Sequence, residues 1–262
     1  MGFAKYSYYF NSLFTIIRGF KNPVKALSSV AGLGYVKTVE IKKPRLNFTV
    51  RGGLDTWCLK ETLIDRFYEK YGFPIQNGWN IMDIGGGIGD YSILAAVQPG
   101  TTVHTYEPYG PSYSLLNQNL TANNIRNVQS FQEAVSSRKG SLIIDRPPND
   151  PLSAQTSLDQ TSGKDSKTVP AITLSTAIGR FENNHVDLLK LDCEGAEYDI
   201  LMDSPSSLLQ QIDHIVMEYH DGFVPRSHAD LANYLEQNHY KVDIYPSPVH
   251  GNIGYMRAER KK

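Results

Sequence analysis

The segment that decides the fold is "IMDIGGGIGDYS", residues 81–92, in which a short apolar run gives way to four glycines within five positions. An apolar run followed by a glycine turn and a helical pattern is typical of a buried strand that leads into a helix. Glycine lets the backbone of such a turn approach a ligand, because no Cβ stands in the way. The segment therefore predicts a core strand of an α/β domain with a ligand site at its carboxyl end.

The spacing of these glycines favours some nucleotide ligands over others. The dinucleotide fingerprint GxGxxG has its last glycine missing in both registers, and the GK[ST] ending of a phosphate-binding loop is absent. Instead, Asp83 precedes Gly85, Gly87 and Gly89 at alternate positions. A carboxylate there suits a ligand with a cationic amino group better than a pyrophosphate, which it would repel.

A second acid supports this interpretation. Glu107 ends the next predicted strand, "TVHTYE", 22 residues after Gly85. A carboxylate at that place can accept hydrogen bonds from both hydroxyls of a ribose. The two features together predict S-adenosylmethionine rather than NAD as the cofactor. Two alternatives stay open, an NAD enzyme and a simple glycine turn in which Asp83 and Glu107 only cap the backbone or face solvent.

The composition limits the classes of protein to which the chain can belong. It has 262 residues, 40% of them hydrophobic, and a formal net charge of −1. We expect no nucleic-acid partner, because proteins that bind duplexes usually carry a strong basic excess. The two cysteines, Cys58 and Cys193, form no CxxC pair, so neither a disulfide framework nor a cysteine zinc site is expected. This cysteine usage fits a reducing cytoplasm.

The chain alternates between strand-like and helical patterns, which predicts a mostly parallel sheet covered on both faces. The last two strand-like runs, "YKVDIYP" and "IGYMRAE", are joined by a turn and predict an antiparallel edge. We divide the chain into an N-terminal helical extension, residues 1–45, and an α/β domain, residues 46–262.

Two segments outside this alternation have roles that the sequence leaves open. Residues 8–30 predict an amphipathic helix that packs on the main domain or contacts a membrane peripherally. No run approaches the eighteen apolar residues of a transmembrane segment. The segment 147–170 is rich in Pro, Ser, Asp and Thr and has no periodicity, so we expect a long loop that is either disordered or a binding lid.

A second informative segment is "VDLLKLDCEGAEYDIL", residues 186–201. Lys190 lies within an apolar strand, and three carboxylates follow within six positions, those of Asp192, Glu194 and Glu197. Such crowding indicates carboxylates positioned beside a cation, which is a sulfonium, a metal ion or Lys190 itself. In the alternative interpretation, Glu194 and Glu197 are acids in the first turn of a helix, where its dipole favours them.

Four segments resemble the FkbM family of S-adenosylmethionine-dependent methyltransferases: "IMDIGGGIGDYSI", "YEPYGPSYSLLNQNL", "VDLLKLDCEGAEYDIL" and "IVMEYH". The resemblance runs from about residue 51 to near the C-terminus, and "LKLDCEGAE" is its most specific part. It implies a Rossmann-like class I methyltransferase fold, with a seven-stranded, mostly parallel sheet and an antiparallel C-terminal strand. It also implies methyl transfer to a hydroxyl of a small molecule, sugar or glycan. One departure is that the family often has Asn at the position of Gly86 or Gly87.

The predicted cofactor residues come from the turn, from the ends of the following strands and from the family motif. Glu133 and Ala134 follow the third strand, at the position that usually contacts the adenine. The full predicted set is Asp83, Gly85, Gly87, Gly89, Tyr91, Glu107, Pro108, Glu133, Ala134 and Asp192.

The predicted catalytic residues follow from the chemistry of transfer to a hydroxyl. The enzyme must align the activated methyl group with the acceptor oxygen and remove the hydroxyl proton. The candidate bases are Asp192 and His220, with Glu218 as an orienting or proton-accepting partner, although His220 could also be a surface histidine. Alternatively, Asp192 with Glu194 or Glu218 could hold a divalent cation that lowers the hydroxyl pKa, a reading that we favour less.

The remaining polar residues of the motif, Lys190, Glu194 and Glu197, are predicted to contact substrate or to support the site structurally. A rival from another class is a cofactor-binding scaffold without turnover, which would meet its partner through the N-terminal helix. The complete carboxylate set and His220 argue against this rival.

Overall fold

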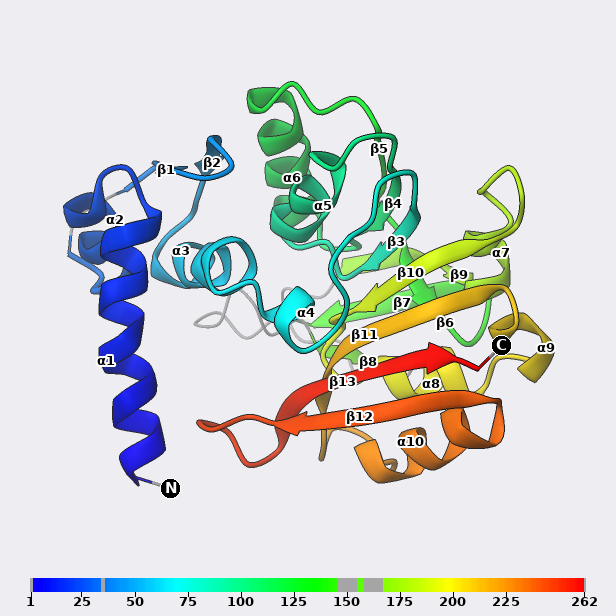
Figure 1. Cartoon of the computed structure of the whole chain (residues 1–262). Coiled ribbons are helices and arrows are strands. Elements are labelled where there is room, and N and C mark those ends of the chain that lie inside the picture. Colours follow the sequence, from blue (N-terminus) through cyan, green and yellow to red (C-terminus); the bar gives the residue numbers. More distant parts are fainter. Residues whose placement is uncertain (1, 34–35, 146–154, 158–166, 262) are drawn as a thin grey trace.

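A central sheet organises the molecule (Figure 1). The structure is a computed structural model that describes residues 2–33, 36–145, 155–157 and 167–261. Within these residues seven strands form the sheet, in the order β12-β13-β11-β10-β3-β4-β5. Their bounds are β3 Asn80–Ile84, β4 Thr102–Tyr106, β5 Val128–Phe131, β10 Val186–Leu191, β11 Ile212–His220, β12 Tyr240–Pro246 and β13 Ile253–Arg260.

The strand directions confirm the predicted fold. Strands β5, β4, β3, β10 and β11 are parallel, whereas β13 runs antiparallel between β11 and β12. The chain proceeds outward from β3 to β4 and β5 and then returns to add β10 on the other side of β3. Strand order therefore reverses between β3 and β10, and ligands of such sheets bind beside the carboxyl ends at this reversal.

Alternate residues of the strands fill two separate cores. Ile81, Leu188 and Val216 belong to the core on one face, which includes α5 (Asp90–Ala96) and α6 (Gly110–Ala122). The residue after each of them, such as Met82 or Leu189, belongs to the core on the other face. That face is covered by α7 (Leu174–Ile178), α8 (Glu197–Met202), α9 (Ser206–Leu209) and α10 (His228–Gln237). A strand buried on both faces is nearly all apolar, which explains why Lys190 in β10 is exceptional.

The N-terminal part contains α1 (Gly2–Gly19), α2 (Pro23–Val30), β1 (Thr38–Ile41), β2 (Leu46–Thr49), α3 (Gly53–Leu59), the π-helical turn η1 (Lys60–Ile64) and α4 (Phe67–Lys70). The prediction of a single helix over residues 8–30 is wrong. Helix α1 ends at Gly19, and a second helix, α2, begins after Asn22, whose side chain caps it. A second break divides η1 from α4, where Arg66 adopts a left-handed conformation.

The boundary that we proposed between residues 45 and 46 lies in the turn of the antiparallel pair β1 and β2. Ile16 and Phe20 of the extension share the core that contains α5 and α6. The extension therefore packs on the α/β domain through apolar side chains. Among the described residues, no helix combines the length and the apolar character that crossing a bilayer requires.

A second sheet contains β6 (Ala134–Ser136), β7 (Gly140–Asp145), β8 (Gln155–Ser157) and β9 (Lys167–Thr173), in the order β6-β9-β7-β8. The prediction of a loop over residues 147–170 is therefore wrong at residues 155–157 and 167–170, which form β8 and the first part of β9. Strand β9 forms there because it pairs with β7 and buries alternate residues such as Val169 and Ala171. The rest of that loop, and with it the question of a lid, lies outside the described residues.

Candidate active site

The glycine turn connects β3 to α5 at the reversal of strand order. Gly85, Gly87 and Gly89 have φ angles of 81°, 53° and 88°, which side chains rarely adopt. A Cβ at Gly85 would lie 1.8 Å from the backbone oxygen of Asp192. The glycine therefore lets the ends of β3 and β10 approach each other closely.

Glu107 follows β4 and is held beside this turn. Its Oε2 accepts a hydrogen bond of 2.8 Å from the backbone N–H of Gly87, and its Oε1 accepts one of 2.8 Å from that of Tyr109. The carboxylate is nearly buried and lines a cavity. Backbone donors thus fix the orientation of an acid that faces ligand space.

The cavity has a volume of about 1650 Å³. Ligand pockets of roughly 300–1,000 Å³ hold one drug-sized molecule, so this one has room for a cofactor and an acceptor. Its opposite wall is formed by α1 and α3, through residues such as Tyr8 and Trp57. The predicted site residues on its wall are Gly85, Gly87, Glu107, Pro108, Ala134, Lys190, Asp192, Glu194, Glu218 and His220.

Four predicted cofactor residues are absent from this wall: Asp83, Gly89, Tyr91 and Glu133. Glu133 pairs with Arg180 at 2.6 Å, and Tyr91 is buried against the ring of Tyr68. Gly89 is the N-cap of α5 and contributes only to the shape of the turn. These four predicted residues therefore lie outside the lining of the cavity.

Asp83 lies beneath the turn, where it pairs with the protein's own cation. Its Oδ1 is 3.0 Å from Nζ of Lys190, and its Oδ2 accepts a hydrogen bond of 2.6 Å from Ser92. Lys190 also donates to the backbone oxygen of Gly85 at 2.9 Å. Our expectation that Asp83 faces a cationic ligand is therefore not what the structure shows, because Lys190 takes that place.

Burial alone would lower the pKa of Lys190, but the carboxylates of Asp83 and Asp192 outweigh it and raise the pKa overall. The lysine is therefore a buried cation, and one of the three cations considered for the motif is present in the chain itself. The ion pair joins β3 to β10 at the site and holds the glycine turn from below.

His220 and Glu197 form a buried pair at the end of β11. His220 is 4% exposed, and its Nδ1 lies 3.0 Å from Oε1 of Glu197. Glu197 is fully buried and also accepts hydrogen bonds from the backbone N–H groups of His220 and Gly195. His220 is therefore buried and not a surface histidine. Glu197 is the first residue of α8 and also the hydrogen-bond partner of His220. A carboxylate on Nδ1 fixes the tautomer and directs Nε2 toward the opposite side.

The charges around His220 change its titration. Burial alone would lower the pKa of His220, but the hydrogen bond to Glu197 and the nearby carboxylates of Asp192 and Glu218 raise it to about 10. This value lies well above the neutral range in which an unperturbed histidine titrates. Burial and the repulsion of Asp192 raise the pKa of Glu218 well above its usual range.

The other carboxylates gather near Nε2 of His220. Oε2 of Glu194 lies 3.8 Å from it, and Asp192 accepts a hydrogen bond of 2.7 Å from the hydroxyl of Tyr68. Ligand atoms of Asp192, Glu218 and His220 lie within 4.8 Å of one another. A divalent cation could therefore use the predicted pair of carboxylates together with His220. The carboxylates suit Mg²⁺ or Mn²⁺, whereas the imidazole is a ligand that Zn²⁺ or Fe²⁺ accepts more readily.

Tyr68 and the cavity residues of α1 were not predicted. Tyr68 belongs to a short helix, and nothing in its sequence neighbourhood points to Asp192, which lies 124 positions away. Lys60 is almost fully buried beside the cavity, pairs with Asp65 at 2.7 Å and donates to Ser12 at 2.6 Å. These contacts arise only when the N-terminal helices pack on the sheet.

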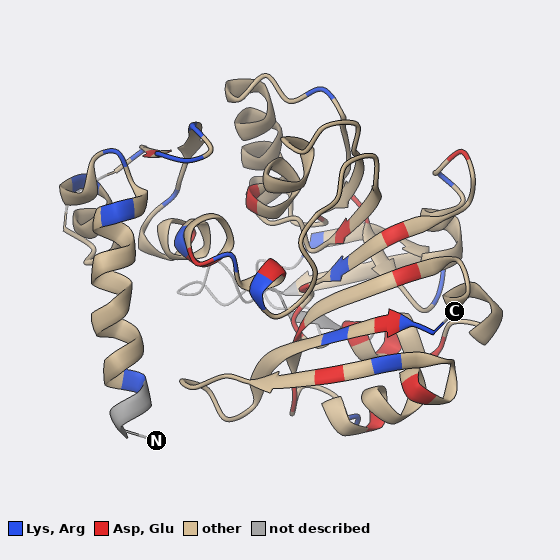
Figure 2. Cartoon of the chain, viewed as in Figure 1, with Lys and Arg blue, Asp and Glu red and all other residues tan. Residues whose placement is uncertain are grey.

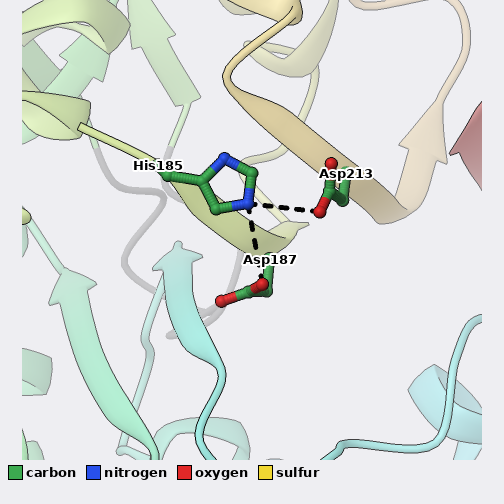
Figure 3. Close-up of side chains that lie close together, drawn as sticks. All are labelled: His185, Asp187 and Asp213. Atoms are coloured by element: carbon green, nitrogen blue, oxygen red, sulfur yellow. Dashed lines mark hydrogen bonds and ion pairs between the residues drawn. The ribbon is translucent and has the colours of Figure 1, made fainter. Parts of the chain in front are cut away.

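A similar group of side chains lies at the opposite, amino edge of the sheet (Figure 3). Nε2 of His185 is 3.2 Å from Asp213 and 3.6 Å from Asp187. Asp187 already accepts from the backbone N–H of Asn80 at 2.7 Å, and Asp213 pairs with Arg260. None of these residues was predicted for the site, and none lines the cavity.

Residues 83–242 match the Methyltransferase FkbM domain. "Methyltransferase 1" of Beauveria bassiana (strain ARSEF 2860) is 29% identical over an alignment of 181 residues, and the match covers 62% of this chain and 72% of that protein. "31-O-demethyl-FK506 methyltransferase FkbM" of Streptomyces tacrolimicus is 26% identical over 91 residues, or 34% of this chain and 35% of that protein. The solved structure of "Methyltransferase FkbM" from Methylobacillus flagellatus KT is 12% identical with a TM-score of 0.49, and covers 78% of this chain and 53% of that one.

The sheet with its single reversed strand and the glycine turn at the cavity define a class I, S-adenosylmethionine-dependent methyltransferase. Since the match covers more than half of its length, the chain belongs to the FkbM methyltransferase family. Family membership confirms the predicted resemblance and replaces the NAD alternative.

Proposed function

We propose that this protein is an O-methyltransferase that acts on a hydroxyl of a small molecule or glycan. The observation that carries the proposal is the buried pair of His220 and Glu197, whose imidazole lies on the wall of a cavity large enough for two ligands. A relative whose name describes the methylation of an oxygen supports the choice of atom.

The residues at the turn fit S-adenosylmethionine. The backbone at Gly87 is open, since a Cβ there would meet only Asp90 at 3.9 Å, and Glu107 lies beside it to receive the ribose hydroxyls. Asp192, Glu194 and Glu218 make the adjoining wall acidic, which suits a ligand that carries a sulfonium and an ammonium group. When bound, this cofactor supplies a methyl group that is already activated for transfer.

His220 serves as the general base in this proposal. Glu197 holds Nδ1–H, so that Nε2 is the atom that receives the hydroxyl proton. In the unliganded site His220 is protonated at neutral pH, because its pKa is raised to about 10. A positive charge beside Asp192 and Glu218 opposes that protonation, so a cationic ligand lowers the pKa of His220 and prepares the base.

A divalent cation on Asp192, Glu218 and His220 is the alternative way to activate the hydroxyl. Chelation distinguishes the two. With His220 as base, turnover after treatment with EDTA stays within about twofold of the untreated rate. Loss of turnover that Mg²⁺ or Mn²⁺ restores would instead make these three side chains metal ligands.

The proposal is tested in two stages, with S-adenosylhomocysteine binding by calorimetry and then with transfer of a labelled methyl group to hydroxylated sugars and lipid-linked glycans. Glu107→Ala should weaken binding by about tenfold or more, because the ribose loses a charged acceptor. Binding without transfer to any acceptor would favour the inactive scaffold, and transfer to nitrogen or sulfur would contradict the O-specificity.

Location and domain organisation complete the proposal. Both cysteines are thiols, which supports a reducing compartment such as the cytoplasm. We retain residues 46–262 as the methyltransferase domain and residues 1–45 as an extension that closes one wall of its cavity.

A further inference from the structure

The outer face of α1 exposes a continuous row of large apolar side chains. We name it the outer stripe; its members are Tyr6, Phe10, Leu13, Phe14 and Ile17, which are between 40% and 78% exposed. Residues spaced three and four apart lie on one side of a helix, so the stripe covers roughly 100° of the circumference. Figure 1 shows α1 at the margin of the molecule, away from the central sheet.

The opposite face of α1 is fixed against the rest of the chain. Ile16 and Ser12 are buried, and Ser12 accepts a hydrogen bond of 2.6 Å from Lys60. Tyr8, Ser12 and Thr15 line the cavity. Since this inner face is held by polar and apolar contacts, the helix cannot turn its outer stripe inward without losing them.

The N-terminal region is strongly basic, although the whole chain has a net charge of −1. Residues 1–45 contain one acid, Glu40, and eight basic residues, which gives a net charge of +7. The basic residues are Lys5, Arg18, Lys21, Lys25, Lys37, Lys42, Lys43 and Arg45. Figure 2 shows this concentration of Lys and Arg on α1, α2 and the β1–β2 pair.

Part of this charge adjoins the end of the outer stripe. Arg18, Lys42 and Lys43 line a small hollow beside the last turn of α1. Lys42 donates to the backbone oxygen of Ile17 at 3.1 Å, which places a cation next to the last apolar residue of the stripe. An apolar row and a cationic cluster are therefore parts of one surface.

We propose that this surface docks on an anionic lipid bilayer, with α1 lying in the interface. Apolar and tyrosine side chains enter the boundary between headgroups and acyl chains, whereas each nearby Lys or Arg is attracted to anionic lipid. A second copy of the chain fits this surface poorly, because a symmetric contact would bring two strongly basic regions together. A nucleic acid matches the charge but leaves the outer stripe in water.

Docking in this orientation has a consequence for the acceptor. The inner face of α1 lines the cavity, so docking through the outer face brings the cavity close to the membrane surface. This position favours an acceptor that is linked to a lipid. This consequence rests on the proposed function, whereas docking itself does not.

Vesicle co-sedimentation of the full chain tests the docking without any measurement of methyl transfer. We expect binding to vesicles of phosphatidylcholine with about 30% phosphatidylglycerol to exceed binding to phosphatidylcholine alone by about tenfold or more. The double variant Phe10→Ser, Phe14→Ser should lose most of this binding. The matched control Val97→Ser, Ile244→Ser removes two exposed apolar residues elsewhere and should bind as the wild type does.

The charge contribution has its own pair of variants. Lys42→Glu, Lys43→Glu should weaken binding to anionic vesicles by about tenfold, whereas Arg138→Glu, Lys139→Glu, an exposed pair outside the N-terminal region, should not. Retained S-adenosylhomocysteine binding shows that each variant is folded. Equal binding by the four variants, or none by the wild type, overturns the proposal. So does a wild-type dimer that Phe10→Ser, Phe14→Ser dissociates, or binding to nucleic acid in place of vesicles.

Discussion

The two edges of the central sheet carry nearly the same chemical groups, yet among the described residues only the group at the carboxyl edge lines the cavity. His220 lies near Asp192 and Glu218 at that edge, and His185 lies near Asp187 and Asp213 at the amino edge (Figure 3). The histidine at the carboxyl edge is 4% exposed and borders the cavity. The side chains at the amino edge are about one quarter to one third exposed and border none.

The partners of the side chains explain the difference. At the amino edge, a backbone N–H and an arginine already pair with the carboxylates, so the cluster is a closed surface network. At the carboxyl edge, the buried Glu197 holds one nitrogen of His220 and leaves the other toward ligand space. A group of reactive residue types is therefore a site only where the fold fixes one side of it and keeps the other accessible.

The largest expected effect comes from removing His220, and His185 provides the matched control. His220→Ala should lower kcat by about 10²- to 10⁴-fold with cofactor binding retained, because the proton loses its acceptor. His185→Ala should leave kcat unchanged. Steady-state kinetics with calorimetry of S-adenosylhomocysteine tests both, and full turnover in His220→Ala would remove its role as base.

A large effect on stability should follow from the carboxylate beneath the turn. Asp83→Asn leaves Lys190 as a buried cation without its closest counterion and should cost about 3–5 kcal/mol of unfolding free energy. Asp187→Asn, at the amino edge, should cost less than about 1 kcal/mol because that ion pair is partly exposed. Urea unfolding measures both. Equal losses would show that burial does not distinguish the two edges.

A smaller effect should appear in the pH dependence of catalysis. The base must be deprotonated, so kcat/KM rises with pH through the pKa of His220 in the free enzyme, which is raised to about 10. Glu197→Gln removes the carboxylate that favours the imidazolium and should move this rise to lower pH by about one unit or more, with a reduced kcat. A rise that stays at the same pH would show that another group is titrating.

The smallest effect concerns a histidine that has no carboxylate. Burial and Arg180 lower the pKa of His104, which stacks on Phe181, to about 4. Below about pH 6.5 the imidazole of His104 is protonated in the unfolded chain, whereas in the folded chain it stays neutral down to about pH 4. The free energy of unfolding therefore falls as the pH decreases from about 6.5 toward 4. Relative to wild type, His104→Phe should gain about 0.7 kcal/mol on lowering the pH from 7 to 6. Thermal unfolding of both proteins at the two pH values measures this gain.

Much of the carboxyl edge was predictable because it depends on local patterns. The glycine turn, Glu107 after the second strand and the carboxylates after β10 all follow apolar strand runs whose ends are legible in the sequence. Parallel strands bring their carboxyl ends to one edge, so these residues had to meet. The direction of each side chain was not predictable. The side chain of Asp83 lies beneath the glycine turn, whereas that of Asp192 lines the cavity.

The sequence by itself determined the alternation of strands and helices, the glycine turn and the family, because apolar periodicity and turn residues act over a few neighbouring positions. Only the tertiary structure decided which partner each acid has. Asp83 pairs with Lys190, Glu197 pairs with His220, and Asp192 accepts a hydrogen bond from Tyr68. The partners in each pair are separated by between 23 and 124 positions in the sequence. The strength of such pairs depends on burial and on distances of a few ångströms, which the chain acquires only when its elements pack.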